Sequence, residues 1–237
     1  MTLPVTGERT VPGLPHENYW FRRHEAAYVA LAPRCANARV LEAGCGEGYG
    51  AAATQAAGAT AVVALDYDAV AVAHARRRYG VPTVQGNLVD LPFADGAFDM
   101  VLGLQTIEHL WDQPQFVAEC ARVLLPGGLL ALTTPNRLTF PPGNAFHARE
   151  LDPAELGALV EGGAFRVESM WGLRHGERIV AHERRHGDIV AAQLASEPER
   201  WPDHLSTFVA GLTAADFVTD PDDIDSGLDL CLVAVRI

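Results

Sequence analysis

The chain has no apolar run long enough to cross a membrane, and its first residues show no basic segment followed by an apolar one. Cysteine is scarce: the four cysteines lie far apart and form no Cys-x-x-Cys pair, which disfavours a zinc site or a disulfide framework. Basic side chains are also few, 18 against 30 acidic ones, and the resulting charge of −12 disfavours nucleic acid and anionic lipid as partners. These absences predict a soluble, cytoplasmic protein that acts on a small molecule and does not insert into a membrane.

The remaining composition is that of a globular domain, with 49% apolar residues and no internal repeat. Short apolar runs alternate with helical patterns. The expected strands cover residues 38–42, 61–66, 82–85, 98–103, 129–133, 164–171 and 228–237. The expected helices cover residues 15–31, 48–57, 68–79, 113–124 and 152–161. This alternation predicts an α/β fold: a doubly wound, mostly parallel, seven-stranded sheet of the Rossmann type, with helices on both faces.

We expect one domain over residues 1–237, made of four consecutive parts. These are an N-terminal arm and helix (1–32), a ligand-binding core (38–171), an insertion with helices near 188–195 and 201–212 (172–227), and the last strand (228–237). An insertion of this length usually serves a function, and a lid over the acceptor is the role that we expect. Its aromatic residues Trp201, Phe208 and Phe217 suit contact with an acceptor. The alternatives are peripheral packing and an oligomer contact, such as that of a homodimer.

A glycine-rich loop between the first strand and the next helix is the strongest motif. Gly44, Gly46 and Gly48 allow the backbone to turn sharply and to approach a ligand closely in front of a helix N-terminus. A dinucleotide fingerprint would need its third glycine at the position of Tyr49. Glu42 before the loop would repel a pyrophosphate but suits a ligand with an ammonium group. Both residues argue against a nicotinamide oxidoreductase.

This segment resembles the first motif of the class I S-adenosylmethionine-dependent methyltransferases, and the resemblance covers most of the chain. It implies that the glycine loop holds the methionine part of the cofactor and that Asp66, at the end of the second strand, binds the ribose hydroxyls. A carboxylate at that position can accept two hydroxyl hydrogen bonds. The adenine contact falls at Asn87, where the family has Asp, and Leu88 and Tyr67 are expected to flank the ring.

An aromatic and basic block at residues 19–24 and a glutamine after the fourth strand supply the other expected cofactor contacts. Trp20 would cover the sulfonium, and Arg22 or Arg23 would pair with the cofactor carboxylate. Gln105 belongs to the same set, because ligands bind outside the carboxyl ends of strands in such sheets. The alternative for the block is an amphipathic helix that packs on the sheet with solvated arginines.

Two histidines follow strands at this edge of the sheet and are candidate general bases. His109 follows the fourth strand and His147 the fifth, and a neutral imidazole is a common base for a hydroxyl proton. We prefer His147 as the base; a structural role is the alternative for each. The spacing Gln105-x-x-Glu108-His109 resembles ubiquinone-pathway O-methyltransferases, in which a Glu-x-x-Glu-His cluster is associated with a divalent metal. That resemblance implies a metal site at Glu108 and His109, with Mg²⁺ as a candidate ion, although Gln105 removes one anionic ligand.

The overall resemblance is greatest to actinobacterial methyltransferases of polymethylated polysaccharide pathways. The segments that carry it are 17–24, 41–50, 108–113, 146–151 and 224–230. It implies an O-methyltransferase that acts on a hydroxyl of a sugar or an oligosaccharide. The loop at 140–144 is shorter than in those relatives, so an acceptor that is a phenol, a quinone or a polyketide is the first alternative. A nicotinamide oxidoreductase and a non-catalytic cofactor-binding protein are the others.

Overall fold

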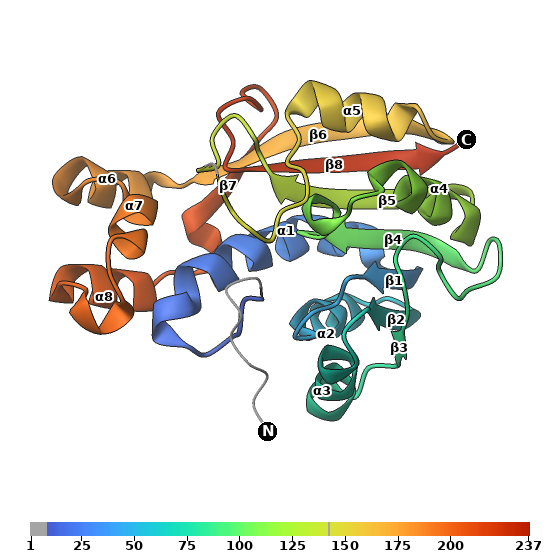
Figure 1. The fold of residues 1–237 in the computed structure, drawn as a ribbon, viewed down its shortest axis with the longest axis horizontal. Helices are drawn as coiled ribbons and strands as arrows, with labels where there is room; N and C mark the ends of the chain where they lie inside the picture. Colours follow the sequence, from blue (N-terminus) through green and yellow to red (C-terminus); the bar gives the residue numbers. More distant parts are fainter. Residues whose placement is uncertain (1–8, 142) are drawn as a thin grey trace.

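The computed structural model describes residues 9–141 and 143–237, which form a twisted sheet covered by helices (Figure 1). The strands are β1 (Arg39–Ala43), β2 (Ala61–Asp66), β3 (Thr83–Gln85), β4 (Phe98–Leu104), β5 (Leu124–Pro135), β6 (Phe165–His175), β7 (Phe217–Asp220) and β8 (Asp229–Arg236). The α-helices are α1 (Asn18–Cys35), α2 (Tyr49–Ala56), α3 (Ala69–Tyr79), α4 (Gln113–Val123), α5 (Pro153–Glu161), α6 (Glu177–His186), α7 (Ile189–Leu194) and α8 (Asp203–Ala210). The 3₁₀ turns are η1 (Pro15–Glu17), η2 (Ile107–His109), η3 (Pro198–Arg200) and η4 (Ala214–Asp216).

The strand order is β3-β2-β1-β4-β5-β8-β6-β7. The first five strands pair in parallel, whereas β8 lies antiparallel between β5 and β6, and β7 is antiparallel to β6. The chain moves outward in opposite directions from β1 and β4. In open α/β sheets a ligand binds outside the carboxyl ends of the strands at such a reversal.

Successive side chains of a strand point to opposite faces of the sheet, so the core consists of one cluster on each face. In β1, Leu41 packs in the cluster that contains Phe116 of α4 and Leu156 of α5, while its neighbour Val40 packs in the cluster that contains Leu31 of α1. This arrangement confirms the predicted Rossmann-like fold. No helix in the described ranges combines the length and the apolar character of a membrane span.

Aspartates fix where several of the helices begin. Asp68 accepts a hydrogen bond from the backbone N–H of Val70 before α3, and Asp152 forms a capping box with Glu155 at α5. Because these caps set the ends of the helices, they also set the loops at the carboxyl edge of the sheet, where the candidate site lies.

The N-terminal helix and the sheet differ from the sequence prediction in their extent. Pro15 begins the turn η1, and α1 then runs from Asn18 to Cys35, with Pro33 inside it, so the helix is displaced along the chain from the expected 15–31. The sheet has eight strands and not seven, because the insertion contributes β7, which pairs with the end of β6. Strand β6 therefore continues to His175, past the expected end at 171.

The insertion leaves the carboxyl end of β6, and its helices group beside the start of α1 (Figure 1). The side chain of Asn18 donates hydrogen bonds to three backbone carbonyls at the end of α8 and just beyond it, those of Val209, Ala210 and Leu212. The three insertion aromatics pack within the insertion or against α1, and Trp201 donates its indole N–H to the carbonyl of Ser196. These contacts make the three aromatics part of the small core that holds the insertion together, and their contact with an acceptor stays a prediction.

Candidate active site

The glycine loop follows β1 and has the geometry that its sequence predicts. Gly44, Gly46 and Gly48 all have positive φ, at 89°, 50° and 97°. A Cβ at Gly44 would lie 2.6 Å from Oγ1 of Thr106, and one at Gly48 would lie 2.5 Å from Cβ of Ala75. A side chain is therefore excluded at both positions by backbone conformation and by contact.

Asp66 ends β2 beside this loop and holds it in place. Its Oδ2 accepts the backbone N–H of Gly46 at 2.8 Å, and its Oδ1 accepts that of Asp68 at 2.9 Å. An ionised carboxylate has about four acceptor positions, so Asp66 retains capacity for two hydroxyl donors. Its position thus suits the ribose contact that the sequence predicts.

A cavity of about 60 Å³ lies beside the loop. Its lining residues are Arg9, Thr10, His24, Tyr28, Gly44, Cys45, Gly46, Glu47, Tyr49, Leu104, Gln105 and Thr133. Arg9 lies 3.0 Å from a carboxylate oxygen of Asp68 and 4.0 Å from one of Asp66. Pockets for small molecules usually measure roughly 300–1,000 Å³. The cavity as it stands is therefore smaller than the usual site of a cofactor-sized ligand.

Glu42 is a buried ionisable group at the start of the loop. It is 1% exposed, and its Oε1 accepts a hydrogen bond of 2.7 Å from the hydroxyl of Tyr28, which lines the cavity. Its Oε2 has no hydrogen-bond partner among the described residues. Burial raises the pKa of Glu42 to about 8, although the Tyr28 hydrogen bond opposes the change. A buried carboxylate oxygen without a partner fits the ammonium group of the expected cofactor.

Exchange of Glu42 for glutamine is expected to stabilise the cofactor-free protein at alkaline pH. Since the pKa is raised from 4.5 to about 8 on folding, the carboxyl group costs stability as the pH rises from about 4.5, and the whole cost is present above about 8. The Glu42→Gln variant keeps the Tyr28 partner but cannot ionise. Its free energy of unfolding should exceed that of the wild type by an amount on the order of a few kcal/mol at pH 9, and by little at pH 4.5. Urea denaturation at both pH values measures the difference, and an equal effect at both would contradict the assignment.

The arginines and the tryptophan of the aromatic block do not line the cavity. Arg23 is 4% exposed, and its guanidinium forms two bonds of 2.6 Å with Asp229. Arg22 pairs with Glu25 at 2.6 Å, and Trp20 packs edge-on against Tyr19. The structure thus corrects the expectation for Arg23, whose charge is satisfied inside the protein. The arginine that lines the cavity is Arg9. It lies in an arm rich in Pro and Thr, and no motif in the sequence there marks it as a ligand-binding residue.

Gln105 joins the cavity to the buried pair of Arg23 and Asp229. It has a positive φ of 51°, which is uncommon for a residue with a side chain. Its amide nitrogen donates to Oδ1 of Asp229 at 3.1 Å. The cavity wall after β4 is therefore anchored to α1 and β8 through one carboxylate.

The residues expected around adenine lie at the surface or in the core. Tyr67 is 76% exposed, and Asn87 is also exposed, with its Oδ1 accepting the N–H of Val89 at 3.2 Å. Leu88 is 8% exposed and belongs to the core cluster below the sheet edge. Their contacts with a bound adenine stay a prediction.

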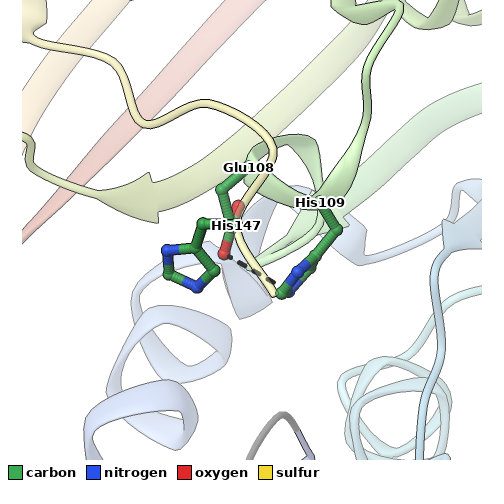
Figure 2. A group of neighbouring side chains, drawn as sticks. All are labelled: Glu108, His109 and His147. Atoms are coloured by element: carbon green, nitrogen blue, oxygen red, sulfur yellow. Dashed lines mark ion pairs between the residues drawn. The ribbon is translucent and has the colours of Figure 1, made fainter. Parts of the chain in front are cut away.

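The two candidate bases are neighbours, as Figure 2 shows. Glu108 and His109 come from η2 after β4, and His147 comes from the loop after β5; the ring centroids of the histidines are 5.1 Å apart. Glu108 is 1% exposed, with Oε2 accepting the hydroxyl of Thr134 at 3.0 Å and Oε1 lying 3.9 Å from Nε2 of His109. Two loops that are distant in the sequence thus form one cluster.

Hydrogen bonds define the tautomer of each neutral imidazole in this cluster. Nδ1 of His109 lies 3.1 Å from the carbonyl oxygen of Phe146, and Nδ1 of His147 lies 2.8 Å from Oε1 of Glu150. Both oxygens can only accept, so each Nδ1 carries the proton and each Nε2 is the basic nitrogen. Nε2 of His147 lies 3.0 Å from the amide nitrogen of Asn144, which donates to it.

The cluster lies close to the cavity. Burial lowers the pKa of His24, a lining residue, to about 4, and Asp229, Arg23 and His109 also act on that pKa. The cluster also adjoins the cavity wall along the chain, because Gln105 lines the cavity and Glu108 and His109 follow it in η2. We expect an acceptor to lie between the cavity and His147.

The cluster also offers three metal-ligand atoms, one each from Glu108, His109 and His147, within 4.8 Å of one another. His147 is a third ligand candidate that the sequence did not predict. Magnesium prefers oxygen ligands and retained water, so two imidazoles and one carboxylate do not fit it.

A family model described as a methyltransferase domain matches residues 41–132. A probable S-adenosylmethionine-dependent methyltransferase of Mycolicibacterium smegmatis is 51% identical over 246 residues, which cover 99% of this chain and 95% of that protein. Phthiotriol/phenolphthiotriol dimycocerosates methyltransferase 1 of Mycobacterium ulcerans is 34% identical over 137 residues, 56% of this chain and 47% of that protein. A solved structure of a SAM-dependent methyltransferase from Thermotoga maritima has the same fold, with a TM-score of 0.63 at 19% identity over 92% of this chain and 93% of that one.

Proposed function

This chain belongs to the S-adenosylmethionine-dependent methyltransferases, and from that premise we propose that it methylates a hydroxyl of a sugar or of a polysaccharide precursor. S-adenosylmethionine is its cofactor and supplies an electrophilic methyl group on a sulfonium. Because the chain belongs to this enzyme family, we no longer consider a nicotinamide oxidoreductase or a non-catalytic cofactor-binding protein. The protein has to bind the cofactor, align the hydroxyl and take its proton.

The observation that carries the proposal is the pairing of His147 with Glu150. A sugar hydroxyl is weakly acidic, so methyl transfer gains from a base at its oxygen. The Nδ1–H of His147 donates to Glu150, which leaves Nε2 to take the hydroxyl proton. The carboxylate then stabilises the imidazolium that forms, as the aspartate does in a Ser-His-Asp triad. The acceptor hydroxyl would take the place of the Asn144 amide at Nε2.

His109 and Glu108 act in this proposal as positioning residues. Thr134 and η2 hold Glu108 in the interior. His109 contacts both that carboxylate, at 3.9 Å, and the carbonyl of Phe146 on the loop that carries His147, at 3.1 Å. A second imidazole at 5.1 Å from the first can orient another hydroxyl of the same acceptor. An acceptor with several hydroxyls, such as a sugar, makes use of both rings.

The cofactor side of the proposal rests on Asp66 and the glycine loop. The Asp66→Ala variant is expected to bind S-adenosylhomocysteine about 10- to 100-fold more weakly, because it loses the charged hydrogen bonds to the ribose, which together are worth about 1.5–3 kcal/mol. Asp66→Asn keeps one acceptor oxygen for the N–H of Gly46 and should show a smaller loss. Isothermal titration calorimetry measures both affinities. If the Asp66→Ala variant binds S-adenosylhomocysteine as tightly as the wild type does, Asp66 does not bind the ribose hydroxyls.

A phenolic or lipid hydroxyl is the second candidate acceptor. The partial likeness to a phthiotriol/phenolphthiotriol dimycocerosates methyltransferase supports it. A phenol ionises more readily than a sugar hydroxyl and so depends less on a base. Incubation with methyl-labelled cofactor and fractionated carbohydrate and lipid extracts separates the two: the proposal expects label in carbohydrate, and label in phenolic lipid alone would favour the second candidate.

A further inference from the structure

The side chain of Glu47, in the middle of the glycine loop, is bonded to α3. Glu47 lines the cavity and is 4% exposed. Its Oε1 lies 2.8 Å from Nε2 of His74, and its Oε2 accepts the hydroxyl of Tyr79 at 2.5 Å. A carboxylate can only accept hydrogen bonds, so Nε2 of His74 carries a proton and donates it. Both donors belong to α3, and one carboxylate therefore joins the loop to that helix.

Helix α3 also packs directly against the loop. A Cβ at Gly48 would lie 2.5 Å from Cβ of Ala75 and 3.3 Å from Cδ2 of Tyr79. Ala75 and Tyr79 are four residues apart, so they lie on one face of α3. The position of the loop is thus set by α3 twice, through packing at Gly48 and through the hydrogen bonds of Glu47.

The backbone around Glu47 depends on such an anchor. Gly46 and Gly48 on either side of it both have positive φ, and glycine loses more conformational freedom on ordering than any other residue. The backbone N–H groups of Gly46 and Gly48 are bonded within the protein, whereas that of Glu47 has no acceptor among the described residues. The N–H of Glu47 is therefore a donor that is available to a ligand in the cavity.

His74 is an unfavourable residue for its buried position on α3. It is 9% exposed, and its Nδ1 is buried without a hydrogen-bond partner among the described residues. A buried polar atom without a partner lowers stability, so burial alone does not favour a histidine at this position. What the imidazole supplies there is the donor at Nε2 that holds Glu47.

We propose that His74 and Tyr79 are positioning residues for the cofactor, which act through the Glu47 carboxylate to hold the glycine loop in the conformation that binds S-adenosylmethionine. Neither residue belongs to the described residues that line the cavity, so each acts on the cofactor through Glu47. Because the loop is ordered before the cofactor arrives, less conformational freedom is lost on binding. The inference concerns the cofactor alone and does not depend on which acceptor is methylated.

Isothermal titration calorimetry with S-adenosylhomocysteine, at a temperature at which every variant is folded, tests this role. The Tyr79→Phe variant loses a single hydroxyl and should bind about 3- to 10-fold more weakly, and His74→Leu should have a similar effect. Glu47→Ala loses both bonds and should weaken binding by about tenfold or more. The double variant Glu47→Ala with Tyr79→Phe should bind no more weakly than Glu47→Ala, because both changes act on the same carboxylate.

A conservative variant separates positioning from a general loss of structure. In Glu47→Gln the amide oxygen can accept from His74 and the amide nitrogen can donate to the oxygen of Tyr79, so both links are kept without the charge. Its affinity for S-adenosylhomocysteine should lie within about threefold of the wild type, since the loop stays anchored.

Thr83→Val is the matched control for the attachment of α3. Thr83 is buried on β3, and its hydroxyl contacts Nε of Arg76 at 3.0 Å and the carbonyl of Val72 at 3.2 Å, both on α3 and neither in the loop. This variant should lower the melting temperature but bind S-adenosylhomocysteine as the wild type does. The proposal is overturned if Tyr79→Phe and His74→Leu bind as tightly as the wild type, or if Thr83→Val weakens binding as much as Glu47→Ala.

Discussion

Replacement of His147 by alanine is expected to lower the turnover number by about 10²- to 10⁴-fold, the usual contribution of a general base, and by no less than about tenfold. The bond from Nδ1 of His147 to Glu150 leaves Nε2 of His147 to accept the hydroxyl proton. Affinity for S-adenosylhomocysteine should be unchanged, because His147 does not line the cavity at the glycine loop. Single-turnover kinetics with a labelled methyl group, together with calorimetry, measure the two quantities separately.

Glu150 and His109 supply the matched controls for this result. Glu150→Gln keeps the size of the side chain at Nδ1 of His147 but removes its negative charge, so an intermediate loss of turnover is expected. If His147→Ala retains near-normal turnover while His109→Ala abolishes it, the roles of the two histidines are reversed. If both alanine variants stay active, the acceptor reacts without a base, and the sugar hydroxyl loses its support.

Removal of Asp229 is expected to destabilise the protein by about 3–5 kcal/mol, the usual cost of leaving a buried partner charge uncompensated. The side chains of Arg23 and Asp229 are 5% and 3% exposed, and two bonds of 2.6 Å join them. Arg23 also donates to the carbonyl of Leu228 at 2.9 Å, and Gln105 donates to the same carboxylate. Loss of Asp229 therefore leaves a buried guanidinium and loosens the cavity wall.

Urea denaturation of the Asp229→Ala and Asp99→Ala variants measures how much free energy of unfolding each variant loses, and so compares the buried ion pair with a surface ion pair. Asp99 pairs with Arg39 at 2.9 Å, but both side chains are more than a third exposed, so its removal should cost about 1 kcal/mol or less. The double variant Arg23→Met with Asp229→Leu should recover most of the lost stability, because neither charge is then buried. A cost for Asp229→Ala no larger than that for Asp99→Ala would contradict the structural role of the buried pair.

The parallel half of the sheet could be predicted from the sequence because its signals are local. Strand β2 has the predicted bounds, Ala61–Asp66, since a continuous apolar run ends there at an aspartate. The insertion could not be predicted as well. Helix α6 carries a single fully buried apolar residue, Ile179, among charged ones, and β7 has only four residues, so neither has the apolar run that marks the core strands.

Part of the candidate site could likewise be predicted from the sequence, and part of it could not. His109 and His147 each follow a parallel strand, and topology brings such loops together at one edge, so their approach could be expected. The partner of Arg23 could not, because Asp229 is 206 residues further along the chain and only the packing of α1 on β8 joins them. For the same reason the sequence alone suggests Arg23 as a cofactor ligand, whereas in the structure Arg9 lines the cavity.

The chemical fate of the transferred methyl group tests the proposed function most directly. The protein is incubated with methyl-labelled S-adenosylmethionine and a carbohydrate extract, and the labelled product is purified and treated with mild alkali. An ether survives this treatment, whereas a methyl ester releases methanol. The proposed function predicts alkali-stable label on a carbohydrate hydroxyl, formed by the wild type and reduced at least about tenfold with His147→Ala. Label released as methanol, or label that enters only phenolic lipid, would contradict it.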